Sequence, residues 1–378
     1  MAYNAPLILS SNLKKKPLEI GSEISLLIKN NFSEFESVEL VKPGFINLKL
    51  KKDFWFNFLS AFGDNKDMLI LEKKNINIEY VSANPTGPLH VGHCRGAIYG
   101  DVLANLLNFV GNNVTKEYYI NDYGNQIHMF AKSVYARLLE INEKVPFPSD
   151  QGLYPGDYLK DIAKNLINKN VIQNLSNYDV IKDQIGTMAM NEAMLMIKND
   201  LFSLGIKHDV FVSEKELVSR NLVEKTIEIL REKNCIYEGI LAKPKGNENE
   251  DWEPRSQLLF KSTDFGDDID RALKKSDGTW TYFANDVAYH AYKLERKFDK
   301  YINVLGADHA GYLKRLKACM DALSNFTSDF ECKVCQLVKL YKSGEPYKMS
   351  KRAGDFITAK ELVDAVGVDA VRFMMIYR

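Results

Sequence analysis

Residues 75–120 read NINIEYVSANPTGPLHVGHCRGAIYGDVLANLLNFVGNNVTKEYYI, and this stretch decides the fold. Residues 76–81 are a short apolar run rich in β-forming side chains, and residues 114–120 are a second such run. Between them, apolar residues recur at helical spacing from 91 to 110, until a Gly-Asn-Asn sequence ends the pattern. A strand, a turn, a helix and a second strand are typical of parallel strands joined by a right-handed crossover. The sequence therefore predicts an α/β fold with a doubly wound, Rossmann-like parallel sheet.

The turn that precedes the helix predicts an anion site. Pro85, Gly87 and Pro88 exclude a helix there, so that His90 and His93 fall in the first helical turn. Unpaired backbone N–H groups and the positive end of the helix dipole meet at this position, and both attract phosphate. Two imidazoles three residues apart share one helical face, where they can donate to phosphate oxygens. The pattern favours a site for a nucleoside triphosphate.

Two other interpretations of the histidine pair are open at this point. His90 and His93 could cap a surface helix or bind zinc, although zinc-binding histidines more often lie four residues apart. The glycines match neither the dinucleotide-binding pattern nor the P-loop. A second motif, residues 348–354 (KMSKRAG), puts Lys348 and Lys351 in a loop that could close over a triphosphate and neutralise departing pyrophosphate. Together the two motifs favour the nucleotide site.

Five stretches carry a resemblance to a known family. They are residues 79–93 (EYVSANPTGPLHVGH), 119–126 (YINDYGNQ), 282–286 (YFAND), 306–309 (GADH) and the lysine loop 348–354. With these motifs the chain resembles a class I aminoacyl-tRNA synthetase, and more closely an arginyl-tRNA synthetase of bacterial type. The resemblance covers nearly the whole chain. It implies that L-arginine is activated with ATP, accompanied by Mg²⁺, and transferred to the 3′ end of tRNA(Arg).

The resemblance also implies roles for individual residues. Four residues are expected to act in catalysis on the phosphates: His90, His93, Lys348 and Lys351. Contacts to ATP are expected from a second set around the motifs: Pro88, Leu89, Gly92, Asp308, His309, Met349 and Ser350. Contacts to L-arginine are expected from a third set: Ser82, Asn84, Tyr282 and Asp286. No residue is expected to bind a metal ion.

Tyr282 and Asp286 would decide which amino acid is bound. If a helix begins near Tyr282, the two side chains lie one turn apart on the same face. A carboxylate accepts two parallel hydrogen bonds from a planar guanidinium, and a tyrosine ring can pack beside it. Lysine would leave part of this pattern unpaired, at a cost of roughly a few kcal/mol. Asp308 and His309 follow a predicted strand, where parallel sheets bind ligands, although a purely structural pair is the alternative.

The order of the patterns predicts five segments. Residues 1–60 form a small α+β module, which by resemblance is a partial tRNA-contacting N-terminal domain. By the same resemblance, residues 70–130 and 276–358 are the two halves of the catalytic core, the second with the lysine loop, and the tract between them is an insertion. Residues 131–275 form a helical insertion, and residues 359–378 begin a helical C-terminal region. The resemblance further implies that the start of the N-terminal domain and a C-terminal anticodon-binding domain are missing.

Composition agrees with a cytoplasmic enzyme. The 378 residues hold 50 basic and 50 acidic side chains, so the formal net charge of zero argues against nucleic-acid binding by bulk attraction. No apolar run reaches the roughly 18 residues of a membrane helix. Five cysteines suit a reducing compartment, and the Cys332–Cys335 pair lacks the second pair of a zinc ribbon. We expect a monomer that does not bind membranes.

Two other functions stay open from the sequence. One is a class I synthetase for a different amino acid, which would share the nucleotide motifs. The other is a non-catalytic synthetase fragment that binds ATP or RNA. The intact histidine and lysine motifs weigh against the fragment, whereas the missing C-terminal domain weighs for it.

Overall fold

The computed structural model comprises two compact units, Met1–Leu71 and Glu72–Arg378, which are described here one at a time. The structure describes residues 1–64, 72–148, 152–169, 175, 177–241, 255–275, 277–338, 340–342, 345–347 and 356–377.

The smaller unit is an α+β module with a three-stranded antiparallel sheet in the order β1-β3-β2. Its elements are β1 (Ala2–Tyr3), α1 (Ala5–Leu13), α2 (Pro17–Asn31), β2 (Phe35–Val41), β3 (Phe45–Leu50) and α3 (Lys52–Asp64). Alternating side chains on the strands bury Val38 and Ile46, and Ile20 of α2 joins them in the core. Gly21 lets α2 approach the sheet, because a Cβ there would lie 2.4 Å from the Leu40 side chain.

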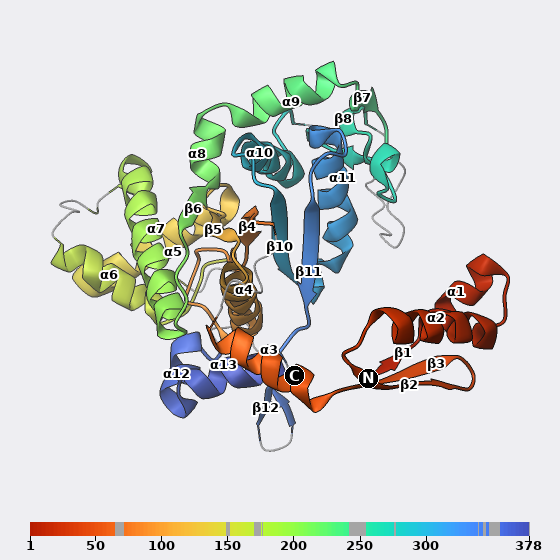
Figure 1. Cartoon of the computed structure of the whole chain (residues 1–378). Coiled ribbons are helices and arrows are strands. Elements are labelled where there is room, and N and C mark those ends of the chain that lie inside the picture. Colours follow the sequence, from red (N-terminus) through yellow and green to blue (C-terminus); the bar gives the residue numbers. More distant parts are fainter. Residues whose placement is uncertain are drawn as a thin grey trace. The chain divides into compact units, whose positions relative to one another are not determined.

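The larger unit is built on a five-stranded parallel sheet in the order β11-β10-β4-β5-β6 (Figure 1). The strands are β4 (Asn75–Glu79), β5 (Asn113–Ile120), β6 (Val210–Ser213), β10 (Lys300–Gly306) and β11 (Phe330–Cys335). From β4 the chain winds outward to β5 and β6, and it later returns beside β4 to form β10 and β11. The predicted doubly wound sheet is therefore confirmed. Its switch point, where such sheets bind ligands, lies between the C-terminal ends of β4 and β10.

Helices cover the sheet and extend it. The helix that follows β4 packs in the main core with three later helices: α4 (Val91–Phe109), α5 (Asn125–Asn142), α6 (Tyr158–Asn168) and α7 (Tyr178–Ser203). A second core joins further helices with a small antiparallel sheet. Its elements are α9 (Leu222–Glu232), β7 (Ile236–Gly239), β8 (Gln257–Phe260), β9 (Arg271–Ala272), α10 (Tyr282–Glu295) and α11 (Leu313–Ser324). The short helix α8 (Glu214–Ser219) links β6 to α9.

Residues 131–275, predicted to be a helical insertion, also supply β6 to the main sheet. β6 is only four residues long, so its apolar run is too short to stand out between two long helical patterns. The remaining described elements are two 3₁₀ segments, η2 (Ser262–Phe265) and η3 (Ala307–Tyr312), the hairpin β12 (Leu340–Lys342) and β13 (Glu345–Tyr347), and the helices α12 (Ala359–Val366) and α13 (Val368–Tyr377).

Helix α4 fits tightly against the sheet because small residues line its inner face. Ala97, Ile98 and Ala104 are fully buried there. A Cβ at Gly100 would lie 2.3 Å from the Tyr80 ring, so only glycine allows this approach. The close packing fixes the N-terminus of α4 at the switch point.

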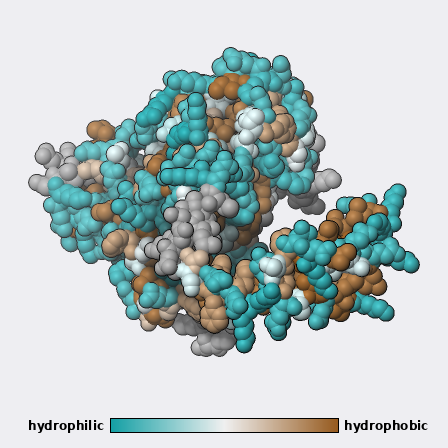
Figure 2. Space-filling model, in the orientation of Figure 1, coloured by the Kyte–Doolittle hydropathy of each residue, from teal (hydrophilic) through white to brown (hydrophobic). Residues whose placement is uncertain are grey.

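Hydrophilic residues cover most of the face of the larger unit that Figure 2 shows. Among the residues that the structure describes, no helix is both long and apolar enough to cross a membrane.

Candidate active site

The turn between β4 and α4 is buried and anchored. Residues 85–89 are all buried although they lie outside helices and strands. The Tyr118 hydroxyl donates to the Ala83 carbonyl over 2.7 Å, and the Tyr158 hydroxyl donates to the Thr86 carbonyl over 2.7 Å. Both bonds satisfy carbonyls that burial removes from water. The turn is thus a fixed platform at the C-terminal end of β4.

Pro88 and Leu89, two of the predicted ATP contacts, lie inside this platform. Both are buried, and neither lines the cleft described below. The Leu89 N–H donates to Asp200 Oδ2 over 2.8 Å, and the Leu89 carbonyl accepts from the Ala359 N–H over 2.8 Å. Their side chains therefore support the turn rather than border the cleft.

His90 and His93 form a reciprocal cap at the N-terminus of α4. The Nδ1 atom of His90 accepts from the Gly92 N–H over 3.1 Å, and the His90 N–H donates to Nδ1 of His93 over 3.2 Å. The two rings stack with their centroids 3.8 Å apart. Because each Nδ1 accepts a hydrogen bond, the proton of each neutral ring lies on Nε2. Both imidazoles thus become Nε2–H donors at the positive end of a 19-residue helix.

A cleft of about 480 Å³ opens beside this cap. It lies at the switch point of the sheet, since its lining comes from the ends of β4, β10 and β11 and from the start of α4. It brings together seven of the predicted site residues: Ser82, Asn84, His90, Gly92, His93, Asp308 and His309. Arg95 and Asn121, which the sequence did not single out, also line it. Asp308 and His309 are exposed at its rim, with His309 Nε2 3.6 Å from Asp308 Oδ2.

The lysine loop falls outside the described residues, and with it the predicted residues Lys348, Met349, Ser350 and Lys351. The chain that follows the loop is described, and it returns directly to the histidine turn. The Val91 N–H donates to the Ile357 carbonyl over 3.0 Å, and His90 forms a β-bridge with Thr358. The segment that follows the lysine loop, more than 250 residues after the histidine motif in the sequence, is thus joined to that motif through the backbone at the start of α4.

The predicted helix start at Tyr282 is confirmed, because α10 begins there, capped by Thr281, whose side chain accepts from the Ala284 N–H. Tyr282 is 61% exposed, whereas Asp286 one turn later is part-buried and accepts a short hydrogen bond from the Tyr312 hydroxyl. Burial raises the pKa of Asp286 to about 7, with Glu79 adding to the rise and Tyr312 opposing it. A cation that reached this carboxylate would favour its charged form.

Glu79 is a second carboxylate near Asp286. It ends β4, is buried, and pairs with Lys293 of α10 over 2.5 Å. Lys293 is fully buried and also donates to Asn303 Oδ1 over 2.9 Å. The Ser82 hydroxyl donates to the other carboxylate oxygen of Glu79 over 3.0 Å. The Glu79 carboxylate is therefore held in place by partners from two segments, α10 and the turn after β4.

The backbone at Ser82 is unusual. Val81 and Ser82 have φ angles of 70° and 37°, in the left-handed region that a β-branched residue such as Val81 rarely adopts. The Ser82 hydroxyl also accepts from the Tyr119 N–H over 3.0 Å, so both its donor and its acceptor are engaged within the protein. Asn84, by contrast, is exposed at the cleft. Strain of this kind is typical of residues whose position matters for function.

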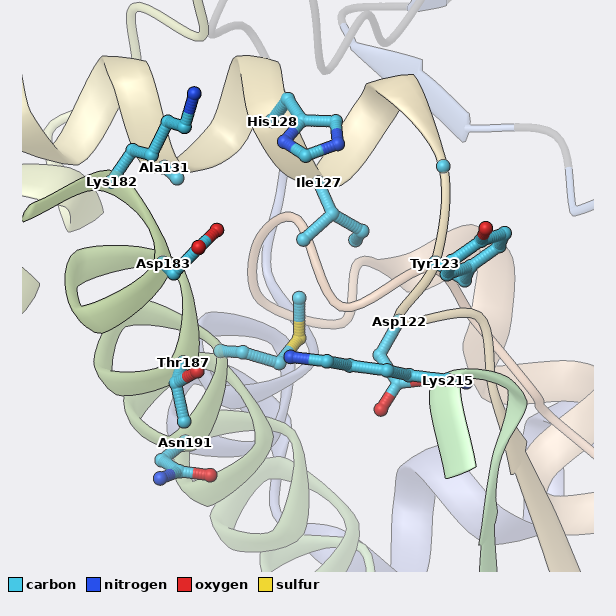
Figure 3. A pocket seen from close by; sticks show the side chains of 13 residues that line it. Asp122, Tyr123, Ile127, His128, Ala131, Lys182, Asp183, Thr187, Asn191 and Lys215 are labelled. Carbon is cyan, nitrogen blue, oxygen red and sulfur yellow. The ribbon is translucent and has the colours of Figure 1, made fainter. Parts of the chain in front are cut away.

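Two smaller clefts share Tyr123 and Gly124, and one of them is also lined by α10. The first, about 350 Å³, is lined by Tyr123, Trp280, Tyr282 and Lys275 among others, and the Lys275 Nζ lies 5.9 Å from the Tyr282 ring centroid. In the second, about 230 Å³, Figure 3 shows side chains of α7 facing those of α5. The labelled residues of α7 are Lys182, Asp183, Thr187 and Asn191, and those of α5 are Ile127, His128 and Ala131. The bases of single-stranded RNA stack on exposed aromatic rings, and nearby lysines attract its phosphate backbone.

Fold and site together define a nucleotide-binding α/β domain of the class I synthetase type. A sequence model described as "tRNA synthetases class I (R), catalytic domain" matches residues 59–375, and one described as "Arginyl tRNA synthetase N terminal domain" matches residues 1–50. The chain belongs to the arginyl-tRNA synthetase family.

Individual relatives agree with this assignment. An arginine–tRNA ligase of Pelagibacter ubique is 51% identical over 100% of this chain, and one of Ehrlichia ruminantium is 48% identical over 99%. A Campylobacter jejuni structure provisionally assigned to arginyl-tRNA synthetase superposes with a TM-score of 0.73 at 35% identity, covering 87% of this chain and 69% of that one. The Thermus thermophilus arginyl-tRNA synthetase supports the fold alone, because it is only 16% identical, with a TM-score of 0.66. That match covers 98% of this chain and 67% of the other. The chain spans 66% of the length of the two ligases.

Proposed function

We propose that this chain carries the arginine-activating core of an arginine–tRNA ligase. The observation that carries the proposal is the position of the His90–His93 cap. It lies at the switch point of the sheet, where Ser82 of the same cleft bonds to Glu79, a carboxylate that interacts with Asp286. A triphosphate site and an acidic amino-acid site side by side are what condensation of arginine with ATP needs.

In the proposed reaction the arginine carboxylate attacks the α-phosphorus of ATP. An arginyl-adenylate forms and pyrophosphate leaves. His90 and His93 donate from Nε2 to phosphate oxygens as negative charge grows on them, and the dipole of α4 adds to this effect. Gly92 leaves room for the nucleotide, and Asp308 and His309 contact it from the end of β10. Lys348 and Lys351 neutralise the pyrophosphate, with Met349 and Ser350 of the same loop beside it.

The guanidinium of arginine binds to Asp286 in this proposal. Tyr282 packs beside the guanidinium, and Asn84 contacts the amino acid from the nucleotide cleft, which it lines. Ser82 contributes through Glu79, because its hydroxyl is already bonded to that carboxylate. The raised pKa of Asp286, about 7, supports a role in binding a cation, since a guanidinium partner would restore the charged form.

Mg²⁺ enters this proposal as the counter-ion of the ATP phosphates. Among the described residues there is no group of three or more His, Cys, Asp or Glu side chains that could hold a metal ion. Asp308 is the only carboxylate among the described residues that line the nucleotide cleft. We therefore assign no protein cage to the ion and derive no step from it.

The third substrate is the 3′ end of tRNA(Arg). The two clefts around Tyr123 support a route for it, because they offer exposed aromatic rings and the lysines Lys182, Lys215 and Lys275. We further propose that residues 1–60 contact tRNA. Residues 70–130 and 276–358 are the halves of the catalytic core in this proposal, with residues 131–275 inserted between them. Residues 359–378 begin a helical region. The family matches at residues 1–50 and 59–375 support the separation of the N-terminal module from the rest of the chain.

We also propose that the chain is a cytoplasmic monomer. Its five unpaired cysteines, four of them buried, suit a reducing compartment. Light scattering of the purified chain measures its mass in solution and so tests whether it is a monomer.

Titration calorimetry with three amino acids tests the specificity of the proposed site. L-arginine should bind, whereas L-citrulline, its uncharged isostere, and L-lysine should bind at least about 100-fold more weakly. Asp286→Asn should remove the preference for arginine over citrulline. Equal binding of lysine and arginine would overturn the choice of substrate.

A further inference from the structure

Asp286 touches a residue that belongs to the nucleotide side of the site. The Tyr312 hydroxyl donates to Asp286 Oδ2 in a short hydrogen bond. Burial and the Asp286 carboxylate raise the pKa of Tyr312 far above its usual range, so the phenol keeps its proton and remains a donor. Arg315 stacks on the Tyr312 ring, with its guanidinium carbon 4.6 Å from the ring centroid.

Tyr312 is also the last residue of η3, the short segment that leaves the end of β10. Asp308 and His309, which line the nucleotide cleft, belong to the same six-residue segment. A nucleotide that contacts Asp308 or His309 therefore acts on the segment that ends in the hydrogen bond to Asp286.

Two other carboxylates lie near Asp286, so the hydrogen bond from Tyr312 is important for keeping Asp286 charged. Glu79 of β4 lies on one side, and Glu214 of α8, itself with a pKa raised to about 7 by burial, is close enough to interact with it. Tyr119 of β5 stays neutral, because burial and the same carboxylates raise its pKa. The Tyr312 hydroxyl and Arg315 favour the charged form of Asp286.

Two further groups sit close to Asp286. Cys319 of α11 is buried, and this burial, together with the nearby Asp286 charge, raises the pKa of its thiol well above the usual range, so the thiol stays neutral. His290, on the same helix as Asp286, is kept neutral by burial, which lowers its pKa to about 4, and its Nδ1 faces the Asp286 carbonyl at 2.7 Å. Neither group can supply positive charge to the carboxylate near neutral pH, so Tyr312 and Arg315 have no local substitute among these neighbours.

We propose that Tyr312 is a positioning residue that orients the arginine-binding carboxylate and makes arginine affinity depend on the occupancy of the nucleotide cleft. This inference rests on the proposed function, in which Asp286 receives the guanidinium. Nucleotide that seats η3 strengthens the bond from Tyr312 to Asp286, and by linkage arginine strengthens nucleotide binding by the same factor. This coupling requires only a change in the hydrogen bond between Tyr312 and Asp286, and no larger movement of the chain.

The sign of the pH dependence follows from the charged form of Asp286. Arginine binds when Asp286 is ionised, so its affinity falls tenfold per pH unit once the pH drops below the pKa of Asp286. Tyr312→Phe removes a donor to the charged form and should raise that pKa by about one unit. Arginine should then bind about fivefold more weakly at pH 7 but less than twofold more weakly at pH 8.5. A loss that came only from damaged packing would not recover at high pH.

The experiment is calorimetric titration of the 378-residue chain with L-arginine between pH 6 and 8.5, with and without α,β-methylene-ATP. Tyr237→Phe is the matched control, since the Tyr237 hydroxyl also donates to a carboxylate, Asp270 Oδ2 at 2.8 Å, but lines none of the described clefts. Tyr312→Phe should shift the acid limb of arginine binding, the pH range in which arginine affinity falls, to higher pH. It should also reduce the effect of the nucleotide analogue on arginine affinity to less than twofold. Tyr237→Phe should do neither.

The wild-type chain supplies a second test that does not depend on the variant folding. The nucleotide analogue should move the acid limb of arginine binding to lower pH, and an unmoved limb would overturn the coupling. An unchanged limb in a folded Tyr312→Phe variant would overturn the positioning role. If the wild type binds no arginine at any pH, the proposed function itself fails, which is a different result from either of these.

Discussion

Lys293→Met should destabilise the larger unit more than any ordinary surface change. Lys293 is fully buried, and its ammonium bonds to Glu79 over 2.5 Å and to Asn303 over 2.9 Å. Methionine fills a similar volume, so the variant removes the charge and two hydrogen bonds without opening a large cavity. A buried carboxylate left without its partner costs about 3–5 kcal/mol. Glu79 is 7% exposed and cannot turn to water, so we expect about 4 kcal/mol for this variant.

Urea unfolding at pH 7.5, followed by circular dichroism, measures this loss as a fall in the midpoint of roughly 1 M or more. Lys300→Met is the matched control, because the Lys300 ammonium pairs with Asp329 over 3.0 Å and Glu331 over 3.3 Å but is 24% exposed. It should cost about 1 kcal/mol or less. Adding Glu79→Gln to Lys293→Met should restore a large part of the stability. If Lys293→Met and Lys300→Met cost the same, the buried pair does not hold the site together.

Three further predictions address the site and its scaffold. His93→Ala should slow adenylate formation by roughly 100-fold or more, while the loss of its cap lowers stability by only about 1 kcal/mol; an unchanged rate of ATP–pyrophosphate exchange would remove His93 from the mechanism. Gly100→Ala should destabilise the chain by about 1–3 kcal/mol, because its Cβ would clash with Tyr80, whereas Gly96→Ala in the same helix meets nothing within 4 Å and should stabilise it by up to about 1 kcal/mol in thermal melts. Asp286→Asn should abolish the fall of arginine affinity below about pH 7, and calorimetry that still finds this fall would place the titrating group elsewhere.

Much of the fold could be predicted from local patterns. Residues 75–120 revealed β4, α4 and β5 because a change from strand to helical periodicity and a Pro-Gly-Pro turn all lie within one short stretch. The helix at Tyr282 was considered only as a condition, although Thr281 just before it is a good N-cap residue.

The supports of the site could not be predicted in the same way. Lys293 and Glu79 are 214 residues apart in the sequence, and no local periodicity links them. Lys293 reads as an ordinary charged residue near the end of a helix, yet it is fully buried. Tyr312 likewise has no sequence signal, because its role depends on where η3 ends relative to α10. Glu79 stood in the quoted family motif, and its place at the end of a buried strand was the one available sign of its importance.

The most direct test of the account is ATP–pyrophosphate exchange by the purified 378-residue chain, with and without tRNA(Arg), comparing arginine with lysine. The account predicts exchange with arginine and none with lysine. Exchange that proceeds with another amino acid and not with arginine would contradict it.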